Sequence, residues 1–351
     1  MKAVLGLEDG TSMVGEGFGV EGETAGELVF TTQMTGYMEA LTDASYAGQI
    51  LMFTFPQIGN YGVDEKNFQS LEVKALACVT REVATVPEKN EPMGRYFRDH
   101  GLIGVAGFDT RALTIRTRQR GTLRAALVCD DDASAEHAVE LARVVPPITE
   151  QDLIPQVSTP EPYRVPGGGK RVAVIDLGVK KNMIISLFRR GADIGVFPHD
   201  TRSDVIEAWN PDALFITNGP GDPMRATAAI RCIRNLIGTM PVYGICMGNQ
   251  LTALALGATT HKMKFGHRGS NQPVRFSDGQ IFITTQNHGF VVDCETLPEG
   301  ANACYTNLND DTVEGFEVPD LAIHCVQFHP EAHGGPRDTE SHFFDRMMRS
   351  I

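Results

Sequence analysis

The most reactive side chain of this sequence stands between two glycines. Cys246 lies in the pentad Gly244-Ile245-Cys246-Met247-Gly248, at the end of a short apolar run. Glycines tolerate the sharp strand-to-helix turn that displays a nucleophile at its bend. A helix that starts there favours a thiolate, because its first N–H groups and its dipole stabilise negative charge. The alternative is an ordinary buried thiol, since free cysteine is most often a core residue.

A second group that could do chemistry is His329-Pro330-Glu331. His329 could accept the thiol proton as a general base. Glu331, two residues further on, could bond the other imidazole nitrogen and fix the tautomer. The alternative is that this group only caps a surface loop. Two other histidines, His267 and His288, fit hydrogen-bonded structural roles as well as catalytic ones.

The third group is the hexad Asn218-Gly219-Pro220-Gly221-Asp222-Pro223. Its two glycines remove side chains from the path of a ligand, so the backbone amides stay open. The amides of Gly221 and Met247 could together stabilise an oxyanion. The alternative is a simple turn, which is what a Gly- and Pro-rich hexad most often forms.

Each of these groups follows an apolar run that reads as a strand. In this part of the chain, apolar runs alternate with helical patterns. Strands are expected at 171–178, 194–198, 212–217, 241–245, 281–285 and 323–328. Helices are expected at 180–191, 203–209, 227–238, 247–257 and 338–350. This alternation predicts the α/β class, with an open, mostly parallel sheet flanked by helices. Ligands bind outside the carboxyl ends of the strands in such a sheet. The three groups should therefore meet at one edge, and this convergence favours an active site.

The N-terminal part has a weaker periodicity. Strands are expected at 27–32, 49–54 and 72–79, and helices at 38–42 and 110–118, which predicts a separate α+β domain over residues 1–152. Residues 153–169 are rich in proline and glycine, so we expect a linker without regular elements. The second domain should span residues 170–351.

Composition restricts the function further. The net charge of −13, from 31 basic and 44 acidic residues, argues against nucleic-acid or anionic-membrane partners. The N-terminus does not read as a signal peptide and no apolar stretch is long enough to span a bilayer, so we expect a cytoplasmic protein. The seven cysteines form no Cys-x-x-Cys pair, and no His-Glu-x-x-His occurs. We therefore expect reduced thiols and no metal.

With these residues in place, the C-terminal half resembles the class I glutamine amidotransferases. The family motifs appear as TNGPGDP, YGICMGNQ and VQFHPEA. The whole chain is similar to the carbamoyl-phosphate synthetase small (glutaminase) subunits, a resemblance that adds the stretches MTGYMEALTDASYAGQI, FPQIGNYG, MKFGHRGSNQPV and QNHGF. These motifs run from near the N-terminus to the end of the chain.

The resemblance implies that Cys246, His329 and Glu331 form a triad that releases ammonia from glutamine through a γ-glutamyl thioester. By position, the glutamine-binding set would be Ser45, Gly219, Gly221, Met247, Gln250, Asn287, Gly289 and Phe290. The ammonia should pass through an internal passage to a large synthetase subunit in a heterodimer or higher oligomer. ATP and a divalent metal would belong to that partner, and this chain has no Gly-x-x-x-x-Gly-Lys-Ser/Thr loop. The product would feed arginine or pyrimidine biosynthesis.

Two residues depart from the family pattern. Ala44 stands where the family usually has proline, before Ser45, and Asn249 stands where it usually has histidine. We expect Asn249 to bond neighbouring backbone in a structural role, because an amide cannot exchange a proton near neutrality. Two other functions remain open at this point: an amidotransferase subunit of a different synthase, and a catalytically impaired regulatory scaffold.

Overall fold

The computed structural model describes residues 1–332 and 334–351. These residues form two compact units, Met1–Gln151 and Asp152–Ile351. In neither unit is any helix of the described residues long and apolar enough to cross a membrane.

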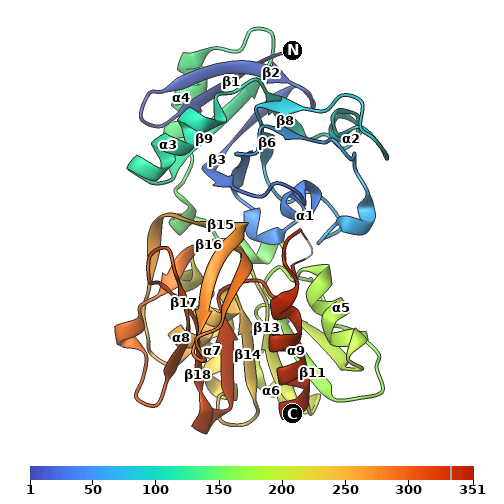
Figure 1. The fold of residues 1–351 in the computed structure, drawn as a ribbon, viewed down its shortest axis with the longest axis vertical. Coiled ribbons are helices and arrows are strands. Elements are labelled where there is room, and N and C mark those ends of the chain that lie inside the picture. Colours follow the sequence, from blue (N-terminus) through green and yellow to red (C-terminus); the bar gives the residue numbers. More distant parts are fainter. Residues whose placement is uncertain (333) are drawn as a thin grey trace. The chain divides into compact units, whose positions relative to one another are not determined.

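The first unit is built around a closed barrel (Figure 1, blue to green). Going round the barrel, the strands are β1 (Lys2–Leu7), β2 (Ser12–Gly17), β8 (Ile103–Ala106), β6 (Ala77–Val79), β4 (Gln49–Phe53), β3 (Gly22–Thr31) and β9 (Leu123–Cys129). The barrel closes because β1 pairs with both β2 and β9. Two short strands, β5 (Gln57–Ile58) and β7 (Glu82–Val83), form a separate pair.

Four helices accompany the barrel: α1 (Tyr37–Leu41), α2 (Met93–Asp99), α3 (Thr110–Arg120) and α4 (Ala135–Val144). Helix α4 begins where the side chain of Ser134 accepts a hydrogen bond from the backbone N–H of His137, which satisfies one free donor of its first turn. Its Ala138 packs against Val4 and Val128 of the barrel. The predicted mixture of helices and strands in this part is confirmed, whereas the closed barrel was not predicted.

The second unit contains one ten-stranded sheet. In spatial order its strands are β10 (Tyr163–Val165), β12 (Asp193–Pro198), β11 (Arg171–Asp176), β13 (Ala213–Ile216), β14 (Val242–Ile245), β19 (Ile323–Val326), β18 (Val313–Val318), β17 (Asn302–Asn307), β15 (Thr260–Phe276) and β16 (Ile281–Val292). The five strands from β12 to β19 are parallel. The other pairings are antiparallel. The predicted α/β class is confirmed, but the prediction of a mostly parallel sheet is wrong, because only four of the nine strand pairings are parallel.

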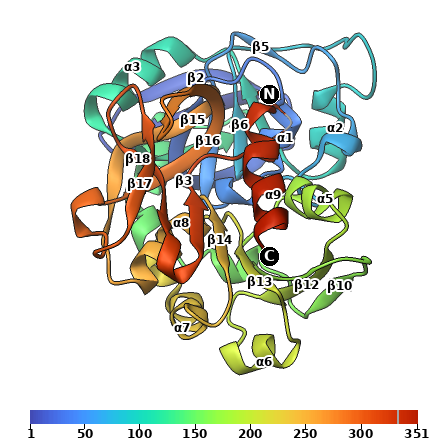
Figure 2. The ribbon, with the colours of Figure 1, turned by 60° about the horizontal axis from the view of Figure 1, so that its bottom comes forward.

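Helices cover both faces of the parallel strands (Figures 1 and 2). Along β11, Ala173 and Ile175 join the core under α6 (Ser203–Ala208), α7 (Thr227–Leu236) and α8 (Met247–Ala255). Val172 and Val174 join the core under α5 (Lys181–Arg189) and α9 (Asp338–Ser350). Strands buried on both faces are continuously apolar, which explains why their sequence runs were recognisable.

The prediction that residues 153–169 contain no regular element is wrong. The segment holds a short 3-10 turn at Ile154–Gln156 and the edge strand β10. Strand β10 pairs antiparallel with β12, and Arg164 binds the carboxylate of Asp193 through two hydrogen bonds of 2.8 and 2.7 Å. An edge strand has a free side, so proline and glycine can flank it without removing central ladder bonds.

Candidate active site

Cys246 occupies a strained bend between β14 and α8. Its backbone has φ 57° and ψ −103°, a region that a residue with a Cβ atom rarely adopts. The flanking glycines are required by close packing. A Cβ atom on Gly244 would lie 2.6 Å from the carbonyl carbon of Gly248, and one on Gly248 would lie 2.3 Å from the carbonyl oxygen of Ile216. The predicted turn at the end of β14 is therefore present.

His329 and Glu331 come from the loop after β19, the strand beside β14. The backbone N–H of Cys246 donates to the carbonyl of Val326 over 2.8 Å, which aligns the two strand ends. His329 Nδ1 lies 2.8 Å from Glu331 Oε1, and both side chains are fully buried. Among the described residues, His329 Nε2 has no hydrogen-bond partner. Nε2 is therefore the ring nitrogen left to exchange a proton with a reacting group.

A buried lysine that the sequence analysis missed completes this cluster. Lys180 Nζ lies 3.1 Å from His329 Nδ1 and 3.5 Å from Glu331 Oε1. Lys180 follows β11, so it reaches the same carboxyl edge of the sheet as the predicted groups. The position of Lys180 after a predicted parallel strand could have indicated a functional role. The sequence does not distinguish Lys180 from the neighbouring Lys181, however.

The charges of this cluster act on one another. Burial lowers the pKa of His329 most strongly and Lys180 lowers it further, but Glu331 and Cys246 outweigh both and raise it to about 9. For Glu331, burial raises the pKa, while His329 and Lys180 together bring it below its usual value. His329 is therefore an imidazolium at neutral pH, held between a carboxylate and the nucleophile.

The hexad that follows β13 packs tightly against the neighbouring strand end. A Cβ atom on Gly219 would lie 2.6 Å from the carbonyl oxygen of Leu177, and Gly221 has a left-handed φ of 85°. The backbone geometry thus requires glycine at both positions. Because neither residue has a side chain, the backbone amides of the hexad are not covered at these two positions. Asp222 accepts a hydrogen bond from the N–H of Met224 and starts a short turn.

Strand β16 supplies the wall beside the nucleophile. The thiol of Cys246 donates to the carbonyl of Asn287 over 3.6 Å. Gln250, one turn into α8, donates its amide to the carbonyl of Phe290 over 2.7 Å. Gly289 lies between these contacts in the chain. The structure thus brings Gln250 and this part of β16 together with Cys246.

Two further predicted positions have distinct surroundings. Ser45 belongs to the first unit, in the 3-10 turn η1 (Ala44–Tyr46), where Asp43 accepts a hydrogen bond from its backbone N–H. Ala44 is buried in the same turn. The prediction that Asn249 bonds neighbouring backbone is wrong. Its amide donates to the side chain of Gln327 over 3.2 Å.

Comparison with known proteins agrees with this geometry. Residues 173–348 match the family described as glutamine amidotransferase class-I, and residues 5–127 match the carbamoyl-phosphate synthase small chain, CPSase domain. The chain is 50% identical to the carbamoyl phosphate synthase small chain of Methanosarcina acetivorans, with 100% of this chain and 99% of that protein aligned. The corresponding small chain of Methanocaldococcus jannaschii is 46% identical, with 99% of each chain aligned.

A third relative is similar over nearly the same length. The carbamoyl phosphate synthase small chain of Bacillus cereus is 43% identical, over 98% of this chain and 95% of that protein. Both halves of the chain are therefore matched, each by the part of the family that the sequence predicted. The chain belongs to the family of carbamoyl-phosphate synthase small chains and carries a class I glutamine amidotransferase domain.

Proposed function

We propose that this chain hydrolyses glutamine and passes the ammonia to the large subunit of a carbamoyl-phosphate synthetase, which combines it with bicarbonate and ATP. One arrangement carries the proposal: Cys246 lies at a strained bend, and the pKa of the buried His329 responds both to Glu331 and to Cys246. The small-chain match over residues 5–127 favours this partner over another synthase.

In the proposed mechanism, Cys246 Sγ attacks the side-chain amide carbon of glutamine, and the thiol proton resides on His329 Nε2. The tetrahedral oxyanion is stabilised by the amides of Gly221 and Met247. His329 then protonates the leaving nitrogen, and ammonia departs as the C–N bond breaks. Water, deprotonated by the now neutral His329, attacks the thioester and releases glutamate.

Glu331 and Lys180 act through His329. Glu331 Oε1 accepts the Nδ1–H of the imidazole, so the other nitrogen faces the reacting atoms. Lys180 opposes protonation of His329, which keeps its proton available for transfer to the leaving group. A base that held its proton too tightly would be a poor general acid for ammonia.

The proposed glutamine-binding residues are those of the family pattern. Gln250 and the Asn287–Phe290 segment contact one another or the nucleophile. Gly219, Gly221, Met247 and Gly289 would contribute backbone groups, and Ser45 would hydrogen-bond the substrate carboxylate. The chain would act in the cytoplasm, in a heterodimer or a higher oligomer of it, with ATP and a divalent metal bound by the large subunit.

Cys246→Ser tests the proposal in the assembled complex. Glutamine-dependent synthesis should be lost while synthesis from added ammonia persists, because only amide cleavage needs the thiolate. Cys294→Ser is the matched control, since Cys294 is the exposed cysteine of the chain. Substantial glutaminase activity in Cys246→Ser would contradict the assignment.

The same assay measures coupling to the partner. The isolated chain should hydrolyse glutamine slowly and accelerate when a large subunit binds, because an uncoupled glutaminase would waste its substrate. Equal rates at saturating glutamine, with and without the large subunit, would count against an active conformation that depends on assembly.

A further inference from the structure

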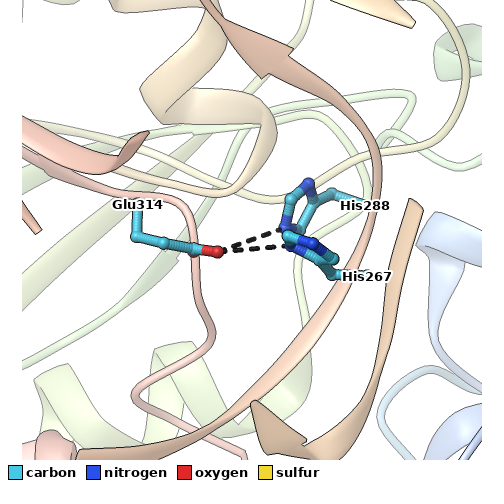
Figure 3. A group of neighbouring side chains, drawn as sticks. All are labelled: His267, His288 and Glu314. Atoms are coloured by element: carbon cyan, nitrogen blue, oxygen red, sulfur yellow. Dashed lines mark ion pairs between the residues drawn. The ribbon is translucent and has the colours of Figure 1, made fainter. Parts of the chain in front are cut away.

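A buried ionic cluster lies in the antiparallel part of the second unit (Figure 3). Its members are His267 on β15, His288 on β16 and Glu314 on β18. Glu314 Oε1 lies 3.3 Å from His267 Nδ1 and 4.0 Å from His288 Nε2. Glu314 has no solvent exposure. A carboxylate so placed needs a compensating charge, because burying an unpaired charge is very costly.

His267 supplies that charge. Its Nε2 lies 2.9 Å from Asp310 Oδ2 and its Nδ1 faces Glu314, so carboxylates stand at both nitrogens. Burial alone lowers the pKa of His267, but Asp310 and Glu314 together raise it to about 9. The imidazolium is thus the main form at neutral pH.

These three residues also have the donor types of a metal site, yet a neighbouring amide argues against a bound cation. Asn307 Nδ2 donates to Glu314 Oε1 over 2.8 Å and lies 3.2 Å from His267 Nδ1. Its orientation is fixed because Asn307 Oδ1 accepts the backbone N–H of Asn309 over 2.9 Å. An N–H donor therefore points at Glu314 Oε1, the carboxylate oxygen that a metal would need.

The cluster is connected to the wall of the candidate active site. His288 is paired with His267 across the β15–β16 ladder, and their rings meet edge to face with centroids 5.0 Å apart. Burial is the largest cause that lowers the pKa of His288, and the positive charges of His267, Arg268 and His329 add to it. His288 is therefore neutral, and its Nδ1 lies 3.0 Å from the carbonyl oxygen of Phe290.

We propose that the buried ion pair between His267 and Glu314 positions the 287–290 segment for glutamine binding, acting through His288. The inference rests on the proposed function. The segment contacts the site at both ends. Asn287 O accepts from Cys246 Sγ, and Phe290 O accepts from Gln250 and lies 3.0 Å from His288 Nδ1. His267 and Glu314 are positioning residues, because neither contacts the reacting thiol.

The pH dependence has a defined sign. His267 has a folded pKa above its ordinary value, so its contribution is complete below about pH 6.5 and is lost as the pH rises through about 9. The charged and titratable groups that surround it are Asp310, Glu314 and His288, with Arg268 adjacent in the chain. Loss of the imidazolium should therefore weaken glutamine binding at alkaline pH.

The test measures kcat and KM for glutamine in the assembled complex, from about pH 7 to about pH 10. Glu314→Gln should raise KM about tenfold at neutral pH while kcat changes less than about twofold. Glu299→Gln is the matched control, because Glu299 is an exposed glutamate before β17. It should leave both parameters unchanged.

The ratio of the two KM values separates positioning from a general effect. The KM of Glu314→Gln divided by that of the parent should fall toward one above about pH 9, where the parent also loses the imidazolium. Titration of the amino group of glutamine and of His329 affects both proteins and largely cancels in this ratio. A purely structural defect would leave the ratio independent of pH.

A milder variant covers the case in which Glu314→Gln does not fold. Asp310→Asn removes the other carboxylate, whose side chain is 38% exposed, and should raise KM in the same direction by a smaller factor. An unchanged KM in a folded variant, a ratio that does not vary with pH, or a stoichiometric metal that Glu314→Gln loses would each overturn the inference. Absence of glutamine hydrolysis in the parent complex would instead refute the proposed function.

Discussion

Lys180→Met should move the alkaline limit of glutaminase activity to higher pH. Burial is the largest influence on the pKa of His329, and Lys180 is the next one that lowers it. Removing the ammonium therefore lets His329 keep its proton to higher pH. If the active form needs the imidazolium to protonate the leaving ammonia, activity must persist to higher pH as well.

The magnitude follows from two distances. At an effective dielectric constant of about 20, Lys180 and Glu331 at 3.5 Å attract one another by about 5 kcal/mol. The repulsion between Lys180 and a protonated His329 at 3.1 Å is of the same size, about 5 kcal/mol. Lys180 thus adds little net energy to the charged His329–Glu331 pair, but it strongly disfavours the proton on His329.

A shift of one pKa unit corresponds to about 1.4 kcal/mol, so a fraction of this repulsion moves the limit by at least about one pH unit. The assay is glutamine hydrolysis by the assembled complex as a function of pH, with thermal melting to verify folding. Lys181→Met is the control, because Lys181 is the exposed neighbour in the chain. An alkaline limit that stays in place or moves to lower pH would refute the electrostatic reasoning.

Two more substitutions test the substrate side and the departure from the family pattern. Ser45→Ala should raise the KM for glutamine far more than it lowers kcat, which is the pattern of lost uniform binding; an unchanged KM would show that Ser45 does not bind substrate. Asn249→His should leave kcat within roughly tenfold, about 1.4 kcal/mol of barrier, because position 249 is buried against Gln327 and holds no proton-transfer role. A gain of orders of magnitude in kcat, or a new ionisation in the pH–rate profile, would identify the parent as an impaired glutaminase.

The parallel part of the fold could be predicted because its strands are buried on both faces. The four central residues of β11, Val172 to Ile175, are all apolar. The period of Ala229, Cys232, Ile233 and Leu236 marked the buried face of α7. Once these strands were recognised, topology alone placed Cys246 and His329 at one edge of the sheet.

Most of the antiparallel part could not be predicted in the same way, and only the start of β16 was expected, at 281–285. Strand β15 (Thr260–Phe276) contains lysines, histidines, glycines and a proline without apolar alternation, and its register with β16 shifts twice. Its stability comes from pairing with β16 and β17, which a local reading of the sequence does not see. The His267–Glu314 pair was hidden for the same reason, because it joins strands that are distant in sequence.

Lys180 shows a sharper limit. Lys180 and Lys181 are adjacent and chemically identical, yet the first is buried against Glu331 and the second is exposed. What separates them is the start of α5 at Lys181, which sends successive side chains in different directions. The angle at which the chain leaves β11 decides which of the two lysines is buried. The amino-acid composition of the segment does not predict that angle.

The register between β14 and β19 aligns the nucleophile Cys246 with its base His329. Ile245 pairs with Val326, and the N–H of Cys246 donates to the carbonyl of Val326, so the two loops leave the sheet at the same level. A slip of one residue between β14 and β19 would turn the side chains of one strand to the opposite face. The tight contacts of Gly244 and Gly248 oppose such a slip, because β14, α8 and the end of β13 fit together only at this spacing. The glycines on either side of Cys246 therefore fix its position along the sheet edge as well as permitting its strained turn.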